Sequence, residues 1–237
     1  MGILESKVVL VTGASRGIGL AIARTLGEEG AQLVLVARNH RPLEQTARNV
    51  PGTVMSMAID VTNPREVKRL FAAVKKRIGR LDILVNNAGV FTFKPFAKTT
   101  LDDWRRNIET NLTSIFLTTQ AALPLLARRG GDLVNILSIS SRVTFENCSA
   151  YSAAKFGALG LTGVLRRELR AKGIRVTAIL PGMTNTRMKN ELSFPVRGQD
   201  LVQPEDVAAA VRAALAPPRH TLIEEILVMP SGGPAGA

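Results

Sequence analysis

Short apolar runs alternate with longer amphipathic stretches along the whole chain of 237 residues. This alternation is typical of repeated strand-helix units in a parallel sheet. The apolar runs predict strands over Lys7 to Val11, Gln32 to Ala37, Thr53 to Ala58, Asp82 to Val85, Asp132 to Ser138, Arg175 to Leu180 and Leu222 to Val228. Several are Val, Ile and Leu runs without alternation, which indicates that helices cover both faces of the sheet.

Amphipathic patterns between these runs predict the helices. They cover Gly17 to Glu29, Arg41 to Asn49, Pro64 to Ile78, Leu101 to Ala127, Ala150 to Lys172 and Pro204 to Ala214. No repeat, linker or shift in composition divides the chain, so we expect one α/β domain over residues 1–237. The connection from Thr184 to Asp200 is unusually long and irregular, and such loops are often lids over a site.

The composition is that of an ordinary globular domain, with 46% hydrophobic and 21% charged residues. Cys148 is the single cysteine, which excludes an internal disulfide and a cysteine-based zinc site. We therefore expect a reducing, cytoplasmic compartment and no metal. Although no apolar run is long enough to span a membrane, the net charge of +12 could attract nucleic acid or another polyanion. The basic residues are scattered in pairs, so we expect solvated helix faces and neither a nucleic-acid nor a membrane partner.

Three glycines, Gly13, Gly17 and Gly19, separate the first predicted strand from the first predicted helix. Glycines at this position allow a tight turn, and the backbone can approach a phosphate closely. The helix start then offers unpaired N–H groups and a positive dipole end to a pyrophosphate. A plain strand-helix connection would also fit, but the position at the head of an α/β chain favours a dinucleotide site.

Tyr151 is the only tyrosine in the chain, and Lys155 follows it by four residues on the same face of a predicted helix. An ammonium beside a phenol is expected to lower the phenol pKa from about 10. Tyr151 can then serve as a general acid for a carbonyl that is being reduced. Ser138, at the end of the fifth predicted strand, can donate a hydrogen bond to the same carbonyl oxygen.

The spacing of the glycines, GxxxGxG, and four later motifs resemble the short-chain dehydrogenase/reductase family. In chain order the motifs are Thr12 to Gly19, Asn86 to Gly89, Asn111, Ser138 followed by Tyr151 to Lys155, and Pro181 to Met188. Each motif singly is modest, but five in the family's order are specific. The resemblance spans nearly the whole chain and implies a doubly wound, seven-stranded parallel sheet in the order 3-2-1-4-5-6-7.

The resemblance also implies a nicotinamide cofactor and a set of residues that bind it. This set is Gly13, Ser15, Arg16, Gly17, Ile18, Gly19, Arg38, Asp60, Val61, Asn87, Ala88, Gly89, Tyr151, Lys155, Pro181, Gly182, Thr184 and Thr186. Asn86 is expected to line the same groove. The implied catalytic residues are Asn111, Ser138, Tyr151 and Lys155. In the family, Lys155 would also bind the nicotinamide ribose and Asn111 would hold a water that relays protons.

NADP(H) is expected in preference to NAD(H). Ala37 stands where NAD-preferring members of the family carry an aspartate. Arg38 follows directly, and Arg16 lies inside the glycine turn. Two guanidinium groups can hold a 2′-phosphate by charge-assisted hydrogen bonds, whereas the alternative is that either arginine is simply exposed.

The residues expected around the substrate are largely apolar, which favours a ketone or an acyl chain. They are Phe91, Phe93, Val143, Thr144, Phe145 and Leu192 to Val196. We therefore expect an NADPH-dependent carbonyl reductase. The first alternative is a 3-oxoacyl-acyl-carrier-protein reductase, with Arg129 and Lys172 docking an acidic carrier; Leu137 and the ending Leu227 to Gly232 depart from that pattern. The second is a dinucleotide-binding sensor without turnover.

Other residues receive simpler interpretations. His40 and His220 are expected on the surface, Cys148 as a small buried residue that could line the pocket, and Trp104 in the core or a subunit interface. The helices predicted over Leu101 to Ala127 and Ala150 to Lys172 carry more apolar residues than one sheet face requires. The corresponding helices form subunit contacts in the family, so the resemblance implies a homo-oligomer, a dimer or tetramer.

Overall fold

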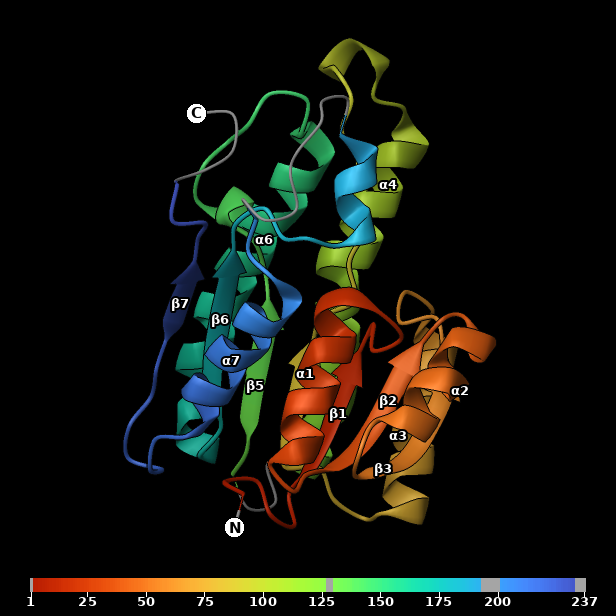
Figure 1. The fold of residues 1–237 in the computed structure, drawn as a ribbon, viewed down its shortest axis with the longest axis vertical. Coiled ribbons are helices and arrows are strands. Elements are labelled where there is room, and N and C mark those ends of the chain that lie inside the picture. The colour runs from red at the N-terminus through yellow and green to blue at the C-terminus, as the bar shows by residue number, and fades with distance from the viewer. Residues whose placement is uncertain (1, 127–129, 193–200, 233–237) are drawn as a thin grey trace.

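The computed structural model describes residues 2–126, 130–192 and 201–232. Its strands are β1 (Val8–Thr12), β2 (Gln32–Ala37), β3 (Thr53–Ala58), β4 (Ile83–Asn86), β5 (Asp132–Ile136), β6 (Arg175–Pro181) and β7 (Glu225–Val228). All neighbouring strands pair in parallel, in the order β3-β2-β1-β4-β5-β6-β7 (Figure 1). The predicted fold class and strand order are confirmed.

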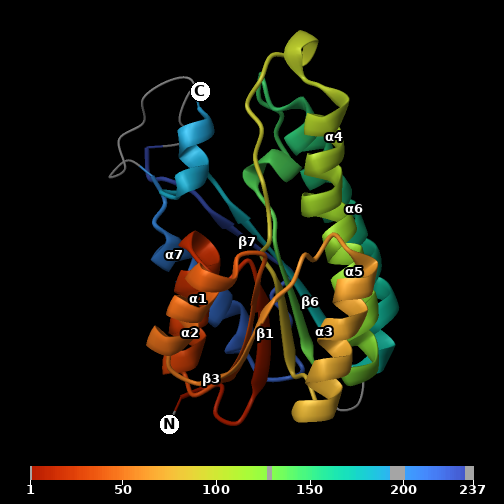
Figure 2. The same ribbon diagram turned by 90° about the vertical axis from the view of Figure 1, so that its right-hand side faces the viewer.

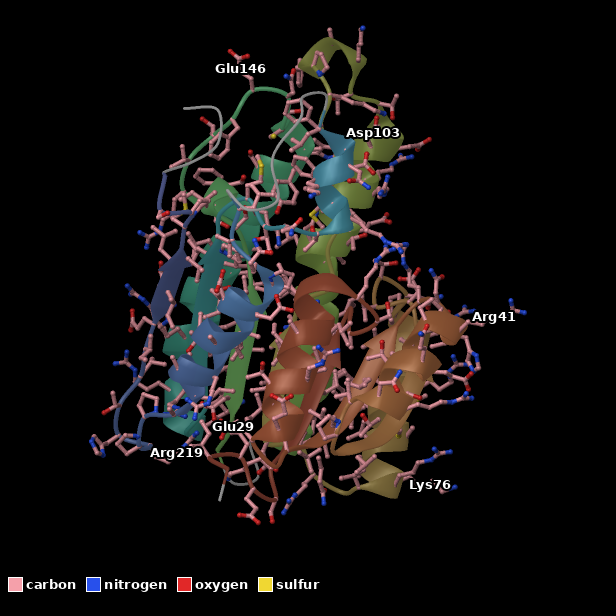
Figure 3. All side chains as sticks on the ribbon, in the orientation of Figure 1. Glu29, Arg41, Lys76, Asp103, Glu146 and Arg219 are labelled. Carbon is pink, nitrogen blue, oxygen red and sulfur yellow. The ribbon has the colours of Figure 1, made fainter. Side chains whose placement is uncertain are left out.

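Helices cover both faces of this sheet, as the uniformly apolar strands predict (Figure 2). One face carries α1 (Gly17–Glu28), α2 (His40–Asn49) and α7 (Pro204–Leu215), and the other carries α3 (Pro64–Arg77), α5 (Ser114–Leu126) and α6 (Ser149–Leu169). Each layer packs on its own buried apolar cluster. Arg41 and Lys76 point outward from α2 and α3 in Figure 3, in agreement with solvated helix faces.

The long helix predicted over Leu101 to Ala127 is interrupted. It consists of α4 (Leu101–Ile108), a π-helical turn at Glu109–Thr113 and α5, and Ala127 lies outside the described residues. Asn111 lies in the π turn, and its side chain bonds both backbone groups of Val90. The turn therefore fastens this helix to the loop after β4. Within the described residues, every helix is too short or too polar to cross a membrane.

Two further boundaries differ from the prediction, one at Ser138 and one at the far end of α6. β5 ends at Ile136, and Ser138 instead caps a short 3-10 helix, η3 (Ile139–Ser141), by accepting a hydrogen bond from Ser140 N. Helix α6 ends at Leu169, and a 3-10 turn, η4 (Arg170–Lys172), leads to Gly173 in the left-handed conformation. At the carboxyl edge of the sheet, α4 and the 3-10 helix η5 (Arg187–Glu191) extend beyond the strands (Figure 1).

Candidate active site

The glycine turn after β1 packs so closely that two of its positions have no room for a side chain. A Cβ on Gly19 would lie 2.3 Å from the Gly13 carbonyl oxygen, and Gly13 itself has a φ of +66°. Asn87 Nδ2 donates to the backbone oxygens of Thr12 (2.9 Å) and Gly13 (3.3 Å). The turn is thus fixed against the loop after β4, with the amino end of α1 opening into the space above.

A cleft of about 1750 Å³ runs across the carboxyl edge of the sheet from this turn. Every residue that the sequence assigns to cofactor binding or catalysis lines it: Gly13, Ser15, Arg16, Gly17, Ile18, Gly19, Arg38, Asp60, Val61, Asn87, Ala88, Gly89, Asn111, Ser138, Tyr151, Lys155, Pro181, Gly182, Thr184 and Thr186. Thr186 borders the turn, because a Cβ on Gly17 would lie 3.3 Å from its Cγ2. A cleft this long, with a side-chain-free turn at one end, fits a dinucleotide.

Asn86 lies under the cleft and does not line it, so the expectation that it lines the cofactor groove is wrong. Its side chain is buried and donates to Thr119 Oγ1 (3.2 Å) and Asn135 Oδ1 (3.0 Å). Thr118 donates to its amide oxygen, and Asn135 donates in turn to Thr162 Oγ1 at 2.9 Å. As the last residue of β4, Asn86 points into the layer of α5 and α6. The sequence did not reveal this buried network, whose members come from four separate elements.

Tyr151, in the first turn of α6, lies at the catalytic end of the cleft and is 9% exposed. The Phe91 ring packs edge-on against it with centroids 4.9 Å apart. Lys155 Nζ lies 5.7 Å from the Tyr151 ring centroid and donates to the Ile136 carbonyl at 3.1 Å. Ser138 forms a hydrogen bond with the tyrosine hydroxyl that favours the phenolate. The hydroxyl, the seryl oxygen and the ammonium thus converge at one wall of the cleft.

Burial, rather than the neighbouring ammonium, dominates the titration of this pair. Desolvation raises the pKa of Tyr151 to about 12, against the smaller lowering effect of the Ser138 hydrogen bond. Desolvation also lowers the pKa of Lys155 to about 8. The expected lowering of the tyrosine pKa is therefore wrong for this structure, because both charged forms are disfavoured in a dry environment.

Asn111 lies on the same cleft, but its amide is fully engaged. The oxygen accepts from Val90 N at 3.1 Å, and the nitrogen donates to Val90 O at 2.9 Å. The nitrogen also lies 3.3 Å from Asn107 Oδ1. The side chain therefore holds the π turn against the loop after β4.

The substrate end of the cleft is apolar, although not in every position expected. Phe91, Phe93, Phe145 and Leu192 line it, whereas Val143 and Thr144 do not; residues 193–196 lie outside the described residues. Met183, Met188 and Met229 also contribute, and sequence reasoning missed them because they come from three segments around β6 and β7. Cys148 is buried and lines the same wall, in agreement with both of its interpretations.

The structure also tests the predicted locations of His40 and Trp104. His40 begins α2 on the surface, 3.5 Å from Glu44, as expected of a surface histidine. Trp104 is 40% exposed on α4, so its assignment to the core is wrong and the interface alternative stays a prediction.

Comparison with known proteins finds relatives that are described as short chain dehydrogenases or oxidoreductases. The short chain dehydrogenase family profile matches residues 7–195. An uncharacterized oxidoreductase of Staphylococcus aureus strain USA300 is 38% identical over 232 residues, which cover 97% of this chain and 100% of that protein. Another, from Staphylococcus saprophyticus, is 35% identical, with 96% and 98% covered.

Two solved structures superpose over almost the whole chain. An alcohol dehydrogenase from the archaeon Thermococcus sibiricus, complexed with 5-hydroxy-NADP, has a TM-score of 0.88 and 30% identity, with 96% of this chain and 97% of that chain covered. A metagenomic short-chain oxidoreductase in complex with NADP has a TM-score of 0.84 and 32% identity, with 97% and 99% covered. Family profile, relatives and fold agree, and the chain belongs to the short chain dehydrogenase family.

Proposed function

We propose that this chain is an NADPH-dependent reductase that converts a ketone to an alcohol, with Tyr151 as the general acid. The observation that carries the proposal is the convergence of Tyr151, Ser138 and Lys155 at one end of a cleft whose other end is the glycine turn. When bound, the reduced nicotinamide would supply the hydride. A dry site that keeps Tyr151 protonated suits donation to a developing alkoxide.

Each polar group at this wall has a distinct proposed task. Ser138 donates to the substrate oxygen and stabilises the charge that develops on it. Tyr151 delivers its proton to that oxygen, and the charged Lys155, held by Ile136, stabilises the resulting phenolate. Lys155 then passes a proton to the Tyr151 phenolate, and because the Asn111 amide is occupied by Val90, its backbone carbonyl is the proposed site of the water that replaces this proton on Lys155.

The adenosine end supports the preference for NADPH. Arg16 and Arg38 both line the cleft there, as does the small Ala37 in place of an acidic residue. Asp60, the acidic residue of the described cleft lining nearest to Arg38 in sequence, accepts hydrogen bonds from the backbone and hydroxyl of Thr62. Within the described residues, neither Arg16 nor Arg38 forms an ion pair, and two unpaired guanidinium groups at this end suit a 2′-phosphate. The NADP named in the two similar structures is consistent with this proposal.

The proposed substrate is an apolar carbonyl compound, because aromatic and methionine side chains surround the tyrosine. Methionine adapts its shape readily, so the pocket would accept several bulky ketones. The 3-oxoacyl-acyl-carrier-protein alternative has less support. Lys172 lies just before the start of β6, whereas the cleft lies at the carboxyl ends of the strands, so Lys172 is at the opposite edge of the sheet from the cleft of its own chain. Arg129 lies outside the described residues.

NADPH oxidation measured across ketones and a β-ketoacyl thioester, with the wild type and Tyr151→Phe, tests the proposal. We expect the wild type to reduce a ketone and the variant to lose at least 100-fold in kcat while NADPH still binds, since general acid catalysis contributes about 10²- to 10⁴-fold. Exclusive reduction of the thioester would favour the carrier-protein alternative. Tight NADPH binding without reduction of any compound would favour the sensor.

A further inference from the structure

Helix α4 borders the cleft with a fixed rotation about its own axis. Asp103, Asn107 and Asn111 follow one another along one stripe, and each bonds the loop after β4: Asp103 accepts from Lys94 at 2.7 Å, Asn107 donates to Thr92 at 2.8 Å and Asn111 bonds Val90. A helix held at three successive turns cannot rotate without losing these bonds.

This rotation places Arg106, an exposed residue, along the cleft. At about 100° per residue, Arg106 and Thr110 lie to one side of the bonded stripe, and both line the cleft. Leu112 lies to the other side and packs against Gly157 of α6. Arg105 and Arg106 are both exposed, but of the two arginines Arg106 alone lines the cleft.

The Arg106 guanidinium has no hydrogen bond or ion pair within the part of the chain that the structure describes. Of the two acidic residues of α4, Asp103 is paired with Lys94, and Asp102, four residues before Arg106, forms no ion pair with it. The described lining carries seven Lys or Arg side chains and three Asp or Glu side chains. They are Arg16, Arg24, Arg38, Arg106, Lys155, Arg187 and Lys189, and Asp60, Glu146 and Glu191. The cleft therefore has an excess of positive charge beyond the adenosine end.

We propose that Arg106 is a specificity-determining residue that binds an anionic oxygen of the ligand in the cleft, a phosphate or a carboxylate. The inference rests on the proposed function. The anion can come from the cofactor diphosphate or from an acidic group on the carbonyl substrate, because Arg106 and Thr110 line the same cleft as the glycine turn and Tyr151. A guanidinium forms the same fork-shaped pair with either anion.

The experiment compares Arg106→Met and Arg106→Lys with the control Arg105→Met. Calorimetry measures the Kd of NADPH, and then, on the NADP⁺ complex, which has no hydride to transfer to a ketone, the Kd of a neutral aryl ketone and of the same ketone bearing a carboxylate. If the cofactor supplies the anion, Arg106→Met raises the Kd of NADPH about tenfold. If the substrate supplies it, Arg106→Met raises only the Kd of the carboxylated ketone by a similar factor. Arg106→Lys should recover part of either loss.

Equal affinities of Arg106→Met and Arg105→Met for all three ligands would overturn the proposal. Binding, and not turnover, is the readout, so the result stands apart from the proposed catalysis. Should Tyr151→Phe reduce ketones as fast as the wild type, the catalytic assignment fails while the Arg106 comparison still gives a result. Should NADPH bind at no accessible concentration, both proposals fail together.

Discussion

Lys155 Nζ donates a hydrogen bond of 3.1 Å to the backbone carbonyl of Ile136 and is thereby held against β5, two residues before Ser138. Burial lowers the pKa of this lysine to about 8 and raises that of Tyr151 to about 12. Near pH 7 both groups are protonated, which is the state that donates a proton. We expect kcat/KM for ketone reduction to be level below pH 7.5 and to fall about tenfold per pH unit well above pH 8.

The pH dependence of the free energy of unfolding distinguishes this fall in kcat/KM from denaturation at high pH. Lys155 has a lower pKa folded (about 8) than unfolded (about 10.5), so the unfolded chain binds more protons between these values. Its contribution to the free energy of unfolding therefore rises from pH 8 to about pH 10. Thermal melting at each pH of the rate profile checks this, and a melting temperature that falls in parallel with the rate would contradict the lysine interpretation.

Gly19→Ala should abolish NADPH binding and destabilise the protein. The added Cβ would lie 2.3 Å from the Gly13 carbonyl oxygen and 2.5 Å from Asn87 Nδ2, both fixed parts of the turn. Gly160→Ala is the matched control, because its Cβ would meet nothing within 4 Å on α6. Because Gly160 lies on the exposed face of α6 with Phe156 and Val164, away from the cleft, alanine there should leave NADPH binding unchanged. NADPH titration of both variants measures the loss of binding, and urea denaturation measures the change in the free energy of unfolding.

Arg38→Ala should weaken NADPH binding about 10- to 50-fold and leave NADH binding nearly unchanged, since the guanidinium is proposed to contact the 2′-phosphate. Arg48→Ala, at the far end of α2 and outside the cleft, is the control. Ala37→Asp should reverse the preference by placing a carboxylate where the phosphate would lie. Fluorescence titration with both cofactors measures the ratio, and a ratio unchanged by Arg38→Ala would contradict the proposed role.

The sequence predicts the sheet well because its central strands are buried on both faces. All five residues of β1 are buried, for example. Their continuous apolar run fits a strand covered on both faces, and it fits neither an alternating strand nor an amphipathic helix. The edge strand β7 is only half-buried and begins three residues later than predicted. The site residues follow from motifs at strand ends, whereas the orientation of Asn86 and the π turn at Asn111 depend on partners distant in sequence. The pKa of Tyr151 likewise depends on burial, which the spacing to Lys155 does not encode.

Asn135→Ala tests the buried network under the cleft. Its removal leaves Asn86 Nδ2 with Thr119 as its one remaining partner and deprives Thr162 Oγ1 of a donor. An unsatisfied buried polar group costs about 1–3 kcal/mol, so we expect a loss of this size in the free energy of unfolding. Thr118→Val, which removes one bond to the Asn86 oxygen, should cost less. Urea denaturation measures both, and a change below about 0.5 kcal/mol for Asn135→Ala would contradict the structural importance of the network.

The outer face of α5 and α6 is expected to be a subunit interface. Phe116, Phe156 and Val164 are 48%, 41% and 51% exposed, although their helices already cover the sheet with other residues. Phe156 and Val164 share one face of α6. Exposed apolar side chains on one face mark contact surfaces, and the family resemblance gives a second copy of the chain as the occupant. Sedimentation should thus yield two or four times the 25.5 kDa chain mass. Val164→Glu should lower that mass, because a carboxylate would be buried without a partner, whereas Val54→Glu on the distant β3 should not. A wild-type mass equal to one chain would refute the interface.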